Sequence, residues 1–275
     1  MDTIISFDLK ADFGFLKKPD TNDPMYLTFN MLHRPALLGI LGAIIGLGGF
    51  SEAKEEEEKQ KPEKGKKQKA FLPEYYQKLQ DLKVGIRPLG AENGNFSKTI
   101  IKYNNAVGYA NEGADKKSGA TLNIIEQTLI KPSYRCYLLL EEGNELHQKI
   151  KDNLKNSEAE YLPYLGKNDF SVWWDNFQVY ATKPYDVMQK GFKMHSIFIR
   201  KSPIKDGLDE FDDMQILLGE EGNTFVYFEN LPTSYHPDLM QYSYNAFTFT
   251  DWNIKQGHPI HNLYELSTHE IIQVF

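Results

Sequence analysis

The feature that most constrains this chain is a glycine-laced apolar segment between residues 35 and 50. Leucine and isoleucine fill most of its positions, while glycine or alanine recurs at spacings of three and four residues. Pro35 pre-sets the first helical turn and Gly48-Gly49 ends the segment, which predicts a helix from about Arg34. Each glycine inside a helix costs roughly 1 kcal/mol relative to alanine, so their number favours close backbone approach to a sheet or a ligand.

Two other interpretations of this segment carry less weight. The run from Pro35 to Phe50 is shorter than the ~20 residues that a membrane-spanning helix needs, and no signal cleavage site follows it. Gly42 and Gly46 fit the GxxxG pattern of membrane helix dimers, but outside a membrane that pattern is more often a helix pressed against a sheet. We therefore expect a buried helix and no membrane contact.

Composition indicates an ordinary globular protein whose charge is unevenly spread. The chain has 275 residues and a net charge of −7. Residues 1–140 carry 20 Lys+Arg against 17 Asp+Glu, whereas residues 141–275 carry 11 against 21. An acidic second half is compatible with RNA on one face and protein partners elsewhere. Cys136 is the only cysteine, so it is expected to be a small buried hydrophobe in a cytoplasmic protein without disulfides.

The order of periodic segments predicts an α+β fold. Strands are expected over 2–10, 83–88, 98–104, 121–130 and 133–140, with helices from Arg34, at 73–82 and at 144–154. This order matches a ferredoxin-like βαββαβ domain with a long β-hairpin inserted between its middle strands. Short strands follow at 177–182, 193–200, 224–229, 246–250 and 270–275, so the second part is expected to be a smaller β-rich module.

We place the domain boundary between residues 160 and 161. The first domain, 1–160, contains two insertions, and the β-rich C-terminal module covers 161–275. Residues 52–70 carry no apolar side chain larger than alanine, so they are expected to form a solvated insertion, mobile or a frayed helix. The inserted hairpin spans 95–128 and has a polar, glycine-rich tip.

Several residues are candidate contacts for a phosphate backbone. A helix N-terminus offers free backbone donors, and Asn30, His33 and Arg34 would add side-chain donors before the first helix. Arg135 alternates with Tyr134 and Cys136 and so points to the other face of its strand. Further basic candidates flank the same strands, and ordinary surface charge remains the alternative for all of them: Lys10, Lys17 or Lys18, and Lys131.

Four stretches, in this order, resemble the Cas-five subunits of type I CRISPR Cascade complexes, those of the I-B type among them, in the RAMP superfamily of RRM-like folds. They are Ile5 to Lys10, Arg34 to Gly46, Pro132-Ser-Tyr-Arg-Cys-Tyr-Leu, and Tyr161-Leu-Pro-Tyr-Leu-Gly166. The stretches Leu263-Tyr-Glu-Leu and Glu270 to Phe275 resemble the family's closing strand. Each motif alone is weak, and their order and spacing carry the resemblance.

The resemblance implies a role in antiviral defence. Such a subunit binds the 5′ handle of a CRISPR RNA (crRNA) and contacts the backbone and large subunits of Cascade. The sequence leaves open whether it also contacts target DNA beside the PAM. Family members use the inserted hairpin as a thumb on the RNA. Unpaired RNA is held by stacking and by cations, so the expected contacts on this arm are Lys98, Lys102, Tyr103, Tyr109, Lys116 and Lys117.

We expect no catalysis, no metal and no cofactor. One branch of the family cuts precursor crRNA, which needs a group that titrates near neutrality beside the scissile phosphate. The first domain offers only His33 and His147, and the arm has no Lys-His pair. His258 and His261 lack further ligands at suitable spacing for a metal. Two alternatives remain: a metal-independent endoribonuclease that uses His33 with Tyr103 or Lys102, and a protein-only scaffold.

Overall fold

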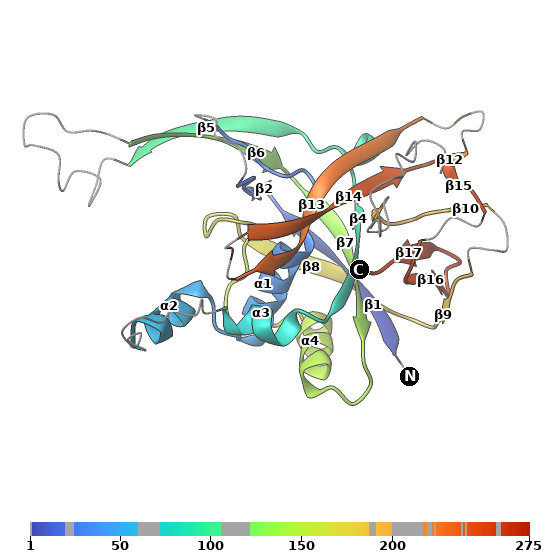
Figure 1. Ribbon diagram of the computed structural model, residues 1–275, viewed down its shortest axis with the longest axis horizontal. Helices are drawn as coiled ribbons and strands as arrows, with labels where there is room; N and C mark the ends of the chain where they lie inside the picture. The colour runs from blue at the N-terminus through green and yellow to red at the C-terminus, as the bar shows by residue number, and fades with distance from the viewer. Residues whose placement is uncertain are drawn as a thin grey trace, which may run out of the picture.

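The computed structural model describes most of the chain, and Figure 1 shows its arrangement. The described residues are 2–19, 25–59, 72–105, 122–186, 191–199, 217–218, 222, 224–237, 239, 241–256 and 260–275. Strands predominate, and the helices gather on one side of a central sheet. The fold is α+β, as the sequence predicted.

The central sheet has four antiparallel strands in the order β4-β7-β1-β8. Their bounds are β1 Thr3–Ala11, β4 Lys83–Pro88, β7 Ser133–Leu140 and β8 Val172–Tyr180. Helix α1 (Arg34–Ile45) lies between β1 and β4 in sequence, and α4 (Glu145–Asn156) lies between β7 and β8. This element order is the predicted βαββαβ order, with the arm inserted between β4 and β7.

The boundary predicted at residue 160 does not coincide with the edge of this sheet. Strand β8 follows that boundary, yet it pairs with β1 along most of its length, from Ile4↔Tyr180 to Ala11↔Val172. At the other edge, the backbone of Phe275 exchanges two hydrogen bonds with Val84 of β4. Both edges of the first domain are therefore built with residues from the second half of the chain.

The two faces of the sheet are buried differently because side chains alternate along a strand. Phe7 and Leu9 of β1 face the helices and belong to the main hydrophobic core. Ile4 faces the other way, into a smaller cluster with Tyr137 and Ile272. The predicted burial of Cys136 is confirmed, because its side chain is fully buried in the main core.

Helix α1 begins as predicted and ends earlier than predicted. His33 is its N-cap, and Gly46 ends it in the left-handed conformation at φ 79°. The ring of Tyr75 explains one of its glycines, because a Cβ on Gly42 would lie 2.4 Å from the Cβ of Tyr75. Close approach is thus confirmed, but the partner is helix α3 (Glu74–Leu79) and not the sheet.

The charged segment after α1 starts as a helix. Helix α2 covers Phe50–Lys59 and carries exposed Glu and Lys side chains, which agrees with the expected solvated helix. The rest of the predicted insertion, from residue 60 to 70, lies outside the described residues. Among the described residues no single helix is long and apolar enough to cross a membrane, and α1 with the start of α2 meets such criteria only as a pair bent by 83°.

The inserted hairpin forms a two-stranded arm that extends away from the body (Figure 1). Strands β5 (Lys98–Asn105) and β6 (Leu122–Ile130) pair antiparallel from Lys98↔Leu129 to Asn105↔Leu122. At the base of the arm, β2 (Phe13–Gly14) and β3 (Met25–Tyr26) add to the other edge of β6. Residues 106–121, between the strands, lie outside the described residues.

The C-terminal part is β-rich, as predicted. Its longest hairpin pairs β13 (Val226–His236) with β14 (Gln241–Thr250), and β13 packs against α1. The remaining strands of this part are short: β9 Thr182–Pro184, β10 Phe192–Lys193, β11 Phe198–Ile199, β12 Leu217–Leu218, β15 Asn253–Ile254, β16 Leu263–Leu266 and β17 Ile271–Gln273. Earlier in the chain, a 3-10 turn at Glu92–Gly94 lies between β4 and β5.

Two alanine substitutions in α1 are expected to act in opposite directions. Gly42→Ala should lower the free energy of unfolding by about 1–3 kcal/mol, because the new Cβ collides with the rigid base of the Tyr75 side chain. Gly39→Ala should raise it by up to about 1 kcal/mol, because a Cβ there meets only the Tyr75 ring at 3.8 Å and helix propensity improves. Urea denaturation of both variants tests this, and equal effects would contradict it.

Candidate nucleic-acid interface

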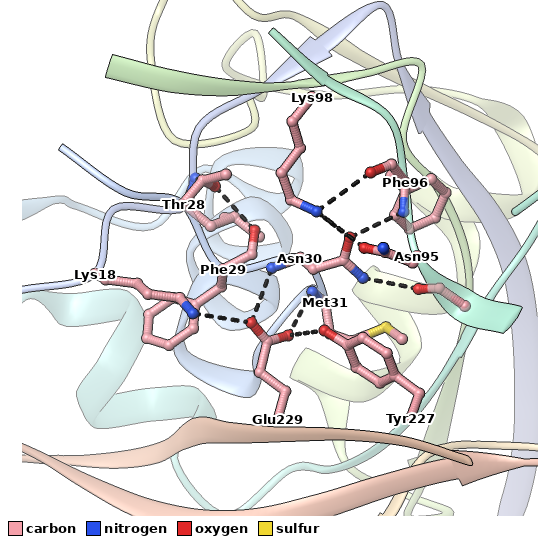
Figure 2. A network of polar contacts seen from close by, with 12 residues as sticks. Lys18, Thr28, Phe29, Asn30, Met31, Asn95, Phe96, Lys98, Tyr227 and Glu229 are labelled. Atoms are coloured by element: carbon pink, nitrogen blue, oxygen red, sulfur yellow. Dashed lines mark hydrogen bonds and ion pairs between the residues drawn. The ribbon is translucent and has the colours of Figure 1, made fainter. Parts of the chain in front are cut away.

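The loop before α1 is held by Asn30, which joins the base of the arm to the body (Figure 2). Its Nδ2 donates to the carbonyl of Gly94 at 2.7 Å. Its Oδ1 accepts from the backbone N–H of Phe96 and from Nζ of Lys98, each at 2.9 Å. Asn30 is itself buried, so its amide positions the arm instead of presenting a free donor to RNA, as the sequence had suggested.

Glu229 of β13 clasps the same loop from the opposite side (Figure 2). Its two carboxylate oxygens accept the backbone N–H groups of Asn30 and Met31, at 3.1 and 3.0 Å. Lys18 pairs with this carboxylate at 3.3 Å, and the hydroxyl of Tyr227 donates to it at 2.9 Å. The loop before α1 was predicted to bind a phosphate. Two of its backbone N–H groups instead bind a carboxylate of the chain itself.

A polar hollow opens between the arm and β13. Its lining includes Lys18, Lys98, Gln127 and Asn230. Nζ of Lys98 donates to three neutral oxygens, those of Asn30, Asn95 and Phe96, and burial lowers its pKa. A lysine that is half-buried among neutral acceptors retains attraction for an incoming phosphate, so Lys98 agrees in position with the predicted RNA contact.

Arg34 has a structural role that differs from the predicted phosphate contact. Its guanidinium is buried and donates to the carbonyl oxygens of Leu82 at 3.0 and 3.3 Å, of Thr233 at 3.1 Å, and of Gln80. These bonds tie α1 to the turn before β4 and to β13. An RNA phosphate would have to displace them, at the cost of leaving buried carbonyls unpaired.

His33 is likewise part of the fold in this structure. Its Nδ1 accepts the backbone N–H of Ala36 at 3.3 Å and caps α1. Burial lowers the pKa of His33 to about 3, so the ring is neutral at pH 7 and its proton sits on Nε2. A ring whose accepting nitrogen is occupied is poorly suited to remove a proton from a 2′-hydroxyl.

The other predicted contacts are scattered. Lys10 pairs with Asp175, and Arg135 forms a bidentate pair with Asp8 at 2.7 and 2.9 Å. These pairs lie on the sheet face opposite α1. Lys131 is exposed at the turn that leads into β7, and Lys102 is exposed on β5. Tyr109, Lys116 and Lys117 lie outside the described residues, so their contacts stay predictions.

A groove lined by tyrosines, here called the tyrosine groove, runs beside α1. It was not predicted from the sequence. It encloses about 820 Å³, and eight of its lining side chains are tyrosines, half of the 16 in the chain. They come from six separate elements, so no sequence pattern groups them. The eight are Tyr26, Tyr75, Tyr76, Tyr103, Tyr161, Tyr164, Tyr235 and Tyr242.

The predicted residues Lys17 and Tyr103 border this groove. Nζ of Lys17 lies 3.8 Å from the ring centroid of Tyr26. Nζ of Lys167 lies 4.6 Å from the ring centroid of Tyr103 and forms an ion pair with the buried Glu126 at 2.6 Å. The hydroxyl of Tyr103 also donates to Glu126, at 3.2 Å. The contacts of Lys167 with Glu126 and Tyr103 join the arm to the loop that carries Lys167.

Comparisons with known proteins add a similarity of shape. No protein-family model matches the sequence, and no curated protein matches it. Several of the solved structures that it resembles come from CRISPR systems. A CRISPR protein from Archaeoglobus fulgidus is similar over 100% of this chain and 98% of its own, at 11% identity and a TM-score of 0.47.

Two further structures are similar to a comparable degree. A chain of a CRISPR RNA-guided surveillance complex covers 94% of this chain and 96% of its own, at 12% identity and a TM-score of 0.44. A chain of the Type III-B Cmr-beta complex bound to cognate target RNA covers 92% and 86%, at 8% identity and a TM-score of 0.45. At such low identity, these similarities assign no role to any residue of this chain.

No metal-ligating cluster of three or more His, Cys, Asp or Glu side chains occurs among the described residues. His258, one of the two histidines considered as a metal pair, lies outside them. Buried histidines are instead used as hydrogen-bond acceptors, since Nδ1 of His147 accepts the backbone N–H of Glu141 at 3.0 Å. The polar groups near the arm are lysines, amides, tyrosine hydroxyls and the carboxylates of Glu126 and Glu229.

His33 should make stability depend on pH below neutrality. Its pKa is lowered from 6.5 to about 3 on folding, so between these values the unfolded chain binds a proton that the folded chain does not. The contribution of neutral His33 to the free energy of unfolding is fully present above pH 6.5. It is lost as the pH falls towards 3, by about 1.4 kcal/mol per pH unit. His33→Asn keeps a capping acceptor without titrating, so its urea-unfolding free energy should fall less steeply from pH 6.5 to 4. Parallel profiles would refute the assignment.

Proposed function

We propose that this chain is a non-catalytic subunit of a type I CRISPR Cascade surveillance complex. It binds the 5′ handle of crRNA, caps the filament of backbone subunits and supports the large subunit in antiviral DNA interference. The resemblance of its motifs supports this role, and those motifs occupy β1, α1, β7 and the loop at Tyr161–Gly166. Its partners are crRNA, the adjacent backbone subunit and the large subunit. Contact with target DNA beside the PAM remains an extension of the proposal.

The observation that carries the proposal is the position of the arm. It extends from the body, and its base lies between two hollows that both contain lysines. Lys98 lines the polar hollow, Lys102 is exposed on β5, and Tyr103 borders the tyrosine groove. Cations that follow a phosphate backbone and aromatic rings that accept bases are the two elements of single-strand RNA binding.

The first alternative is the endoribonuclease. The His33 ring has its Nδ1 occupied and a pKa of about 3, whereas a general base acts best when its pKa lies near the working pH. The hydroxyl of Tyr103 donates to Glu126 and is thus engaged within the arm, while Lys102 is exposed on β5. These contacts favour RNA binding over RNA cleavage by this chain.

The second alternative is the protein-only scaffold. The acidic second half of the chain favours it, since acidic surfaces repel RNA and attract basic proteins. The groups that approach the arm from that half are mixed: Lys167 is cationic, and Glu229 is neutralised by Lys18 and by hydrogen bonds. The local charge beside the arm therefore suits RNA better than the total charge does.

The proposal predicts salt-sensitive binding of repeat RNA without cleavage. Lys102→Gln should weaken binding of the cognate repeat and reduce the slope of log Kd against log salt by about one, because one phosphate contact is lost. Lys155→Gln is the matched control, since Lys155 is exposed at the end of α4, away from the arm. Mobility shifts at 50–200 mM salt, roughly the range over which such contacts are lost, measure both.

Three results would contradict the proposal. Cleavage of the repeat that disappears in His33→Asn would make this chain a processing enzyme. An equal loss in Lys102→Gln and Lys155→Gln would show non-specific attraction only. No RNA binding by the chain alone or with its backbone and large subunits would favour the protein-only scaffold.

A further inference from the structure

The tyrosine groove gathers exposed apolar side chains that elsewhere on the molecule occur singly. Twelve large hydrophobic side chains are exposed among the described residues, and six of them line this one groove. Such a concentration on a soluble protein indicates a binding surface. Three of these six belong to one loop, namely Tyr161 at 54%, Leu162 at 72% and Tyr164 at 45% exposed.

That loop is held rigidly although its side chains are exposed. The backbone N–H of Tyr161 donates a hydrogen bond to the carbonyl of Ala43 at 3.1 Å. The backbone N–H of Leu165 donates to the carbonyl of Phe170 at 2.8 Å. Gly166, at φ 84°, packs so closely on the carbonyl of Phe15 that any Cβ would collide with it. Exposed rings on a fixed backbone lose little entropy when they bind, so this loop is a preorganised platform.

The rings of Tyr161 and Tyr164 have room for a flat ligand. Neither ring is in aromatic contact with another side chain among the described residues, whereas Tyr75, Tyr76 and Tyr242 are. The helix beneath presents small residues to the groove, namely Ala36, Gly39 and Ala43. The packing of the protein does not require glycine at position 39, because a Cβ there would make only ordinary contacts.

The charge at the mouth of the groove is suited to an anionic strand. Lys17 and Lys167 lie over tyrosine rings at the end near the arm. Glu126 is buried, and its charge is compensated by Lys167. Glu52 lies on α2, where its carboxylate accepts the backbone N–H of Gly49. Since Lys167 and Glu126 neutralise each other, the cation that this end of the groove presents to an entering strand is the exposed Lys17.

We propose that this groove holds unpaired bases of the RNA by stacking on Tyr161 and Tyr164, while Lys17 faces the phosphates. The inference rests on the proposed function and adds to it a second contact surface, which lies beside the base of the arm. A nucleic-acid strand suits the groove better than a peptide does, because exposed Lys17 offers a cation and the rings of Tyr161 and Tyr164 offer flat faces, which are the two elements of single-strand binding. Stacking accepts every base, so the groove should tolerate sequence changes.

The test uses a single-stranded RNA octamer that carries 2-aminopurine, whose fluorescence falls on stacking. Wild-type protein should quench it. Tyr164→Ala and Tyr161→Ala should weaken binding about 5- to 100-fold each, whereas the corresponding phenylalanine variants keep the ring and should bind as wild type does. Gly39→Met, which fills the groove from a position with room for a side chain, should also abolish quenching. Trp173→Ala removes an equally exposed aromatic side chain on β8 and is the control.

Salt separates this site from the arm. Loss of Tyr164 should weaken binding by the same factor at low and high salt, because stacking releases no counterions, whereas Lys102→Gln should change the slope. If RNA binding depends on Lys102 but on neither tyrosine, the proposed base site in the groove is contradicted, while the proposed function is still supported. No quenching at protein concentrations up to about 100 µM, the weak end of non-specific binding, would also overturn it.

A third result would reassign the groove to a protein. If the tyrosine variants bind RNA normally but no longer assemble with the backbone or large subunit, the occupant is a partner chain. If no RNA binds even to the assembled complex, the proposed function fails together with the groove. Circular dichroism and urea unfolding of each variant confirm that the loss is not one of folding, and the phenylalanine variants repeat the test in an intact groove.

Discussion

The carboxylate of Glu229 holds together the region on which the rest of the molecule is organised. It receives two consecutive backbone N–H groups of the loop before α1, which no secondary structure satisfies. Without it, these donors would be buried and unpaired at a cost of about 1–3 kcal/mol each. The loop in turn fixes Asn30, and Asn30 fixes the base of the arm through Gly94, Phe96 and Lys98. The position of the arm therefore depends on a residue that lies about 200 positions later in the chain.

Two ways of handling charge occur side by side in this structure. Among the described residues, the two buried acids are each paired with a cation, Asp8 with Arg135 and Glu126 with Lys167. The hydrogen bonds and charge of Arg135 and Asn176 more than offset burial, so the pKa of Asp8 is lowered. Lys98 at the arm differs, because the three hydrogen bonds of its Nζ go to neutral oxygens and not to a carboxylate. A chain with a net charge of −7 can thus still present a cationic region locally.

Much of the fold could be predicted from local sequence because periodicity and caps are local. The strand at 133–140, the helix capped by Asn144 and the two arms of the hairpin all occur close to their expected bounds. The domain boundary was wrong because strand pairing is not local: nothing within 172–180 shows that these residues complete a sheet begun at residue 3.

The site was predictable only in part, for the same reason. Lys17, Lys98 and Tyr103 line the two hollows beside the arm, and their contact with RNA stays a prediction. Arg34 and His33 were expected to face a ligand, yet distant carbonyls and a cap occupy them. The tyrosine groove was missed since its members meet only in three dimensions. The sequence signal that came nearest was Tyr161-Leu-Pro-Tyr-Leu-Gly166, which carried the family resemblance and was not considered as a site.

The almost wholly apolar surface of α1 has a consequence for how the chain folds. Helix α4 and strand β13 both contact this helix, but they are synthesised roughly 100 to 190 residues after it. Contacts of such long sequence separation form slowly, because the loops between them must close first. A nascent chain therefore exposes part of this apolar helix until the ribosome has passed β13, and chaperone binding to residues 34–45 should decline only after that point.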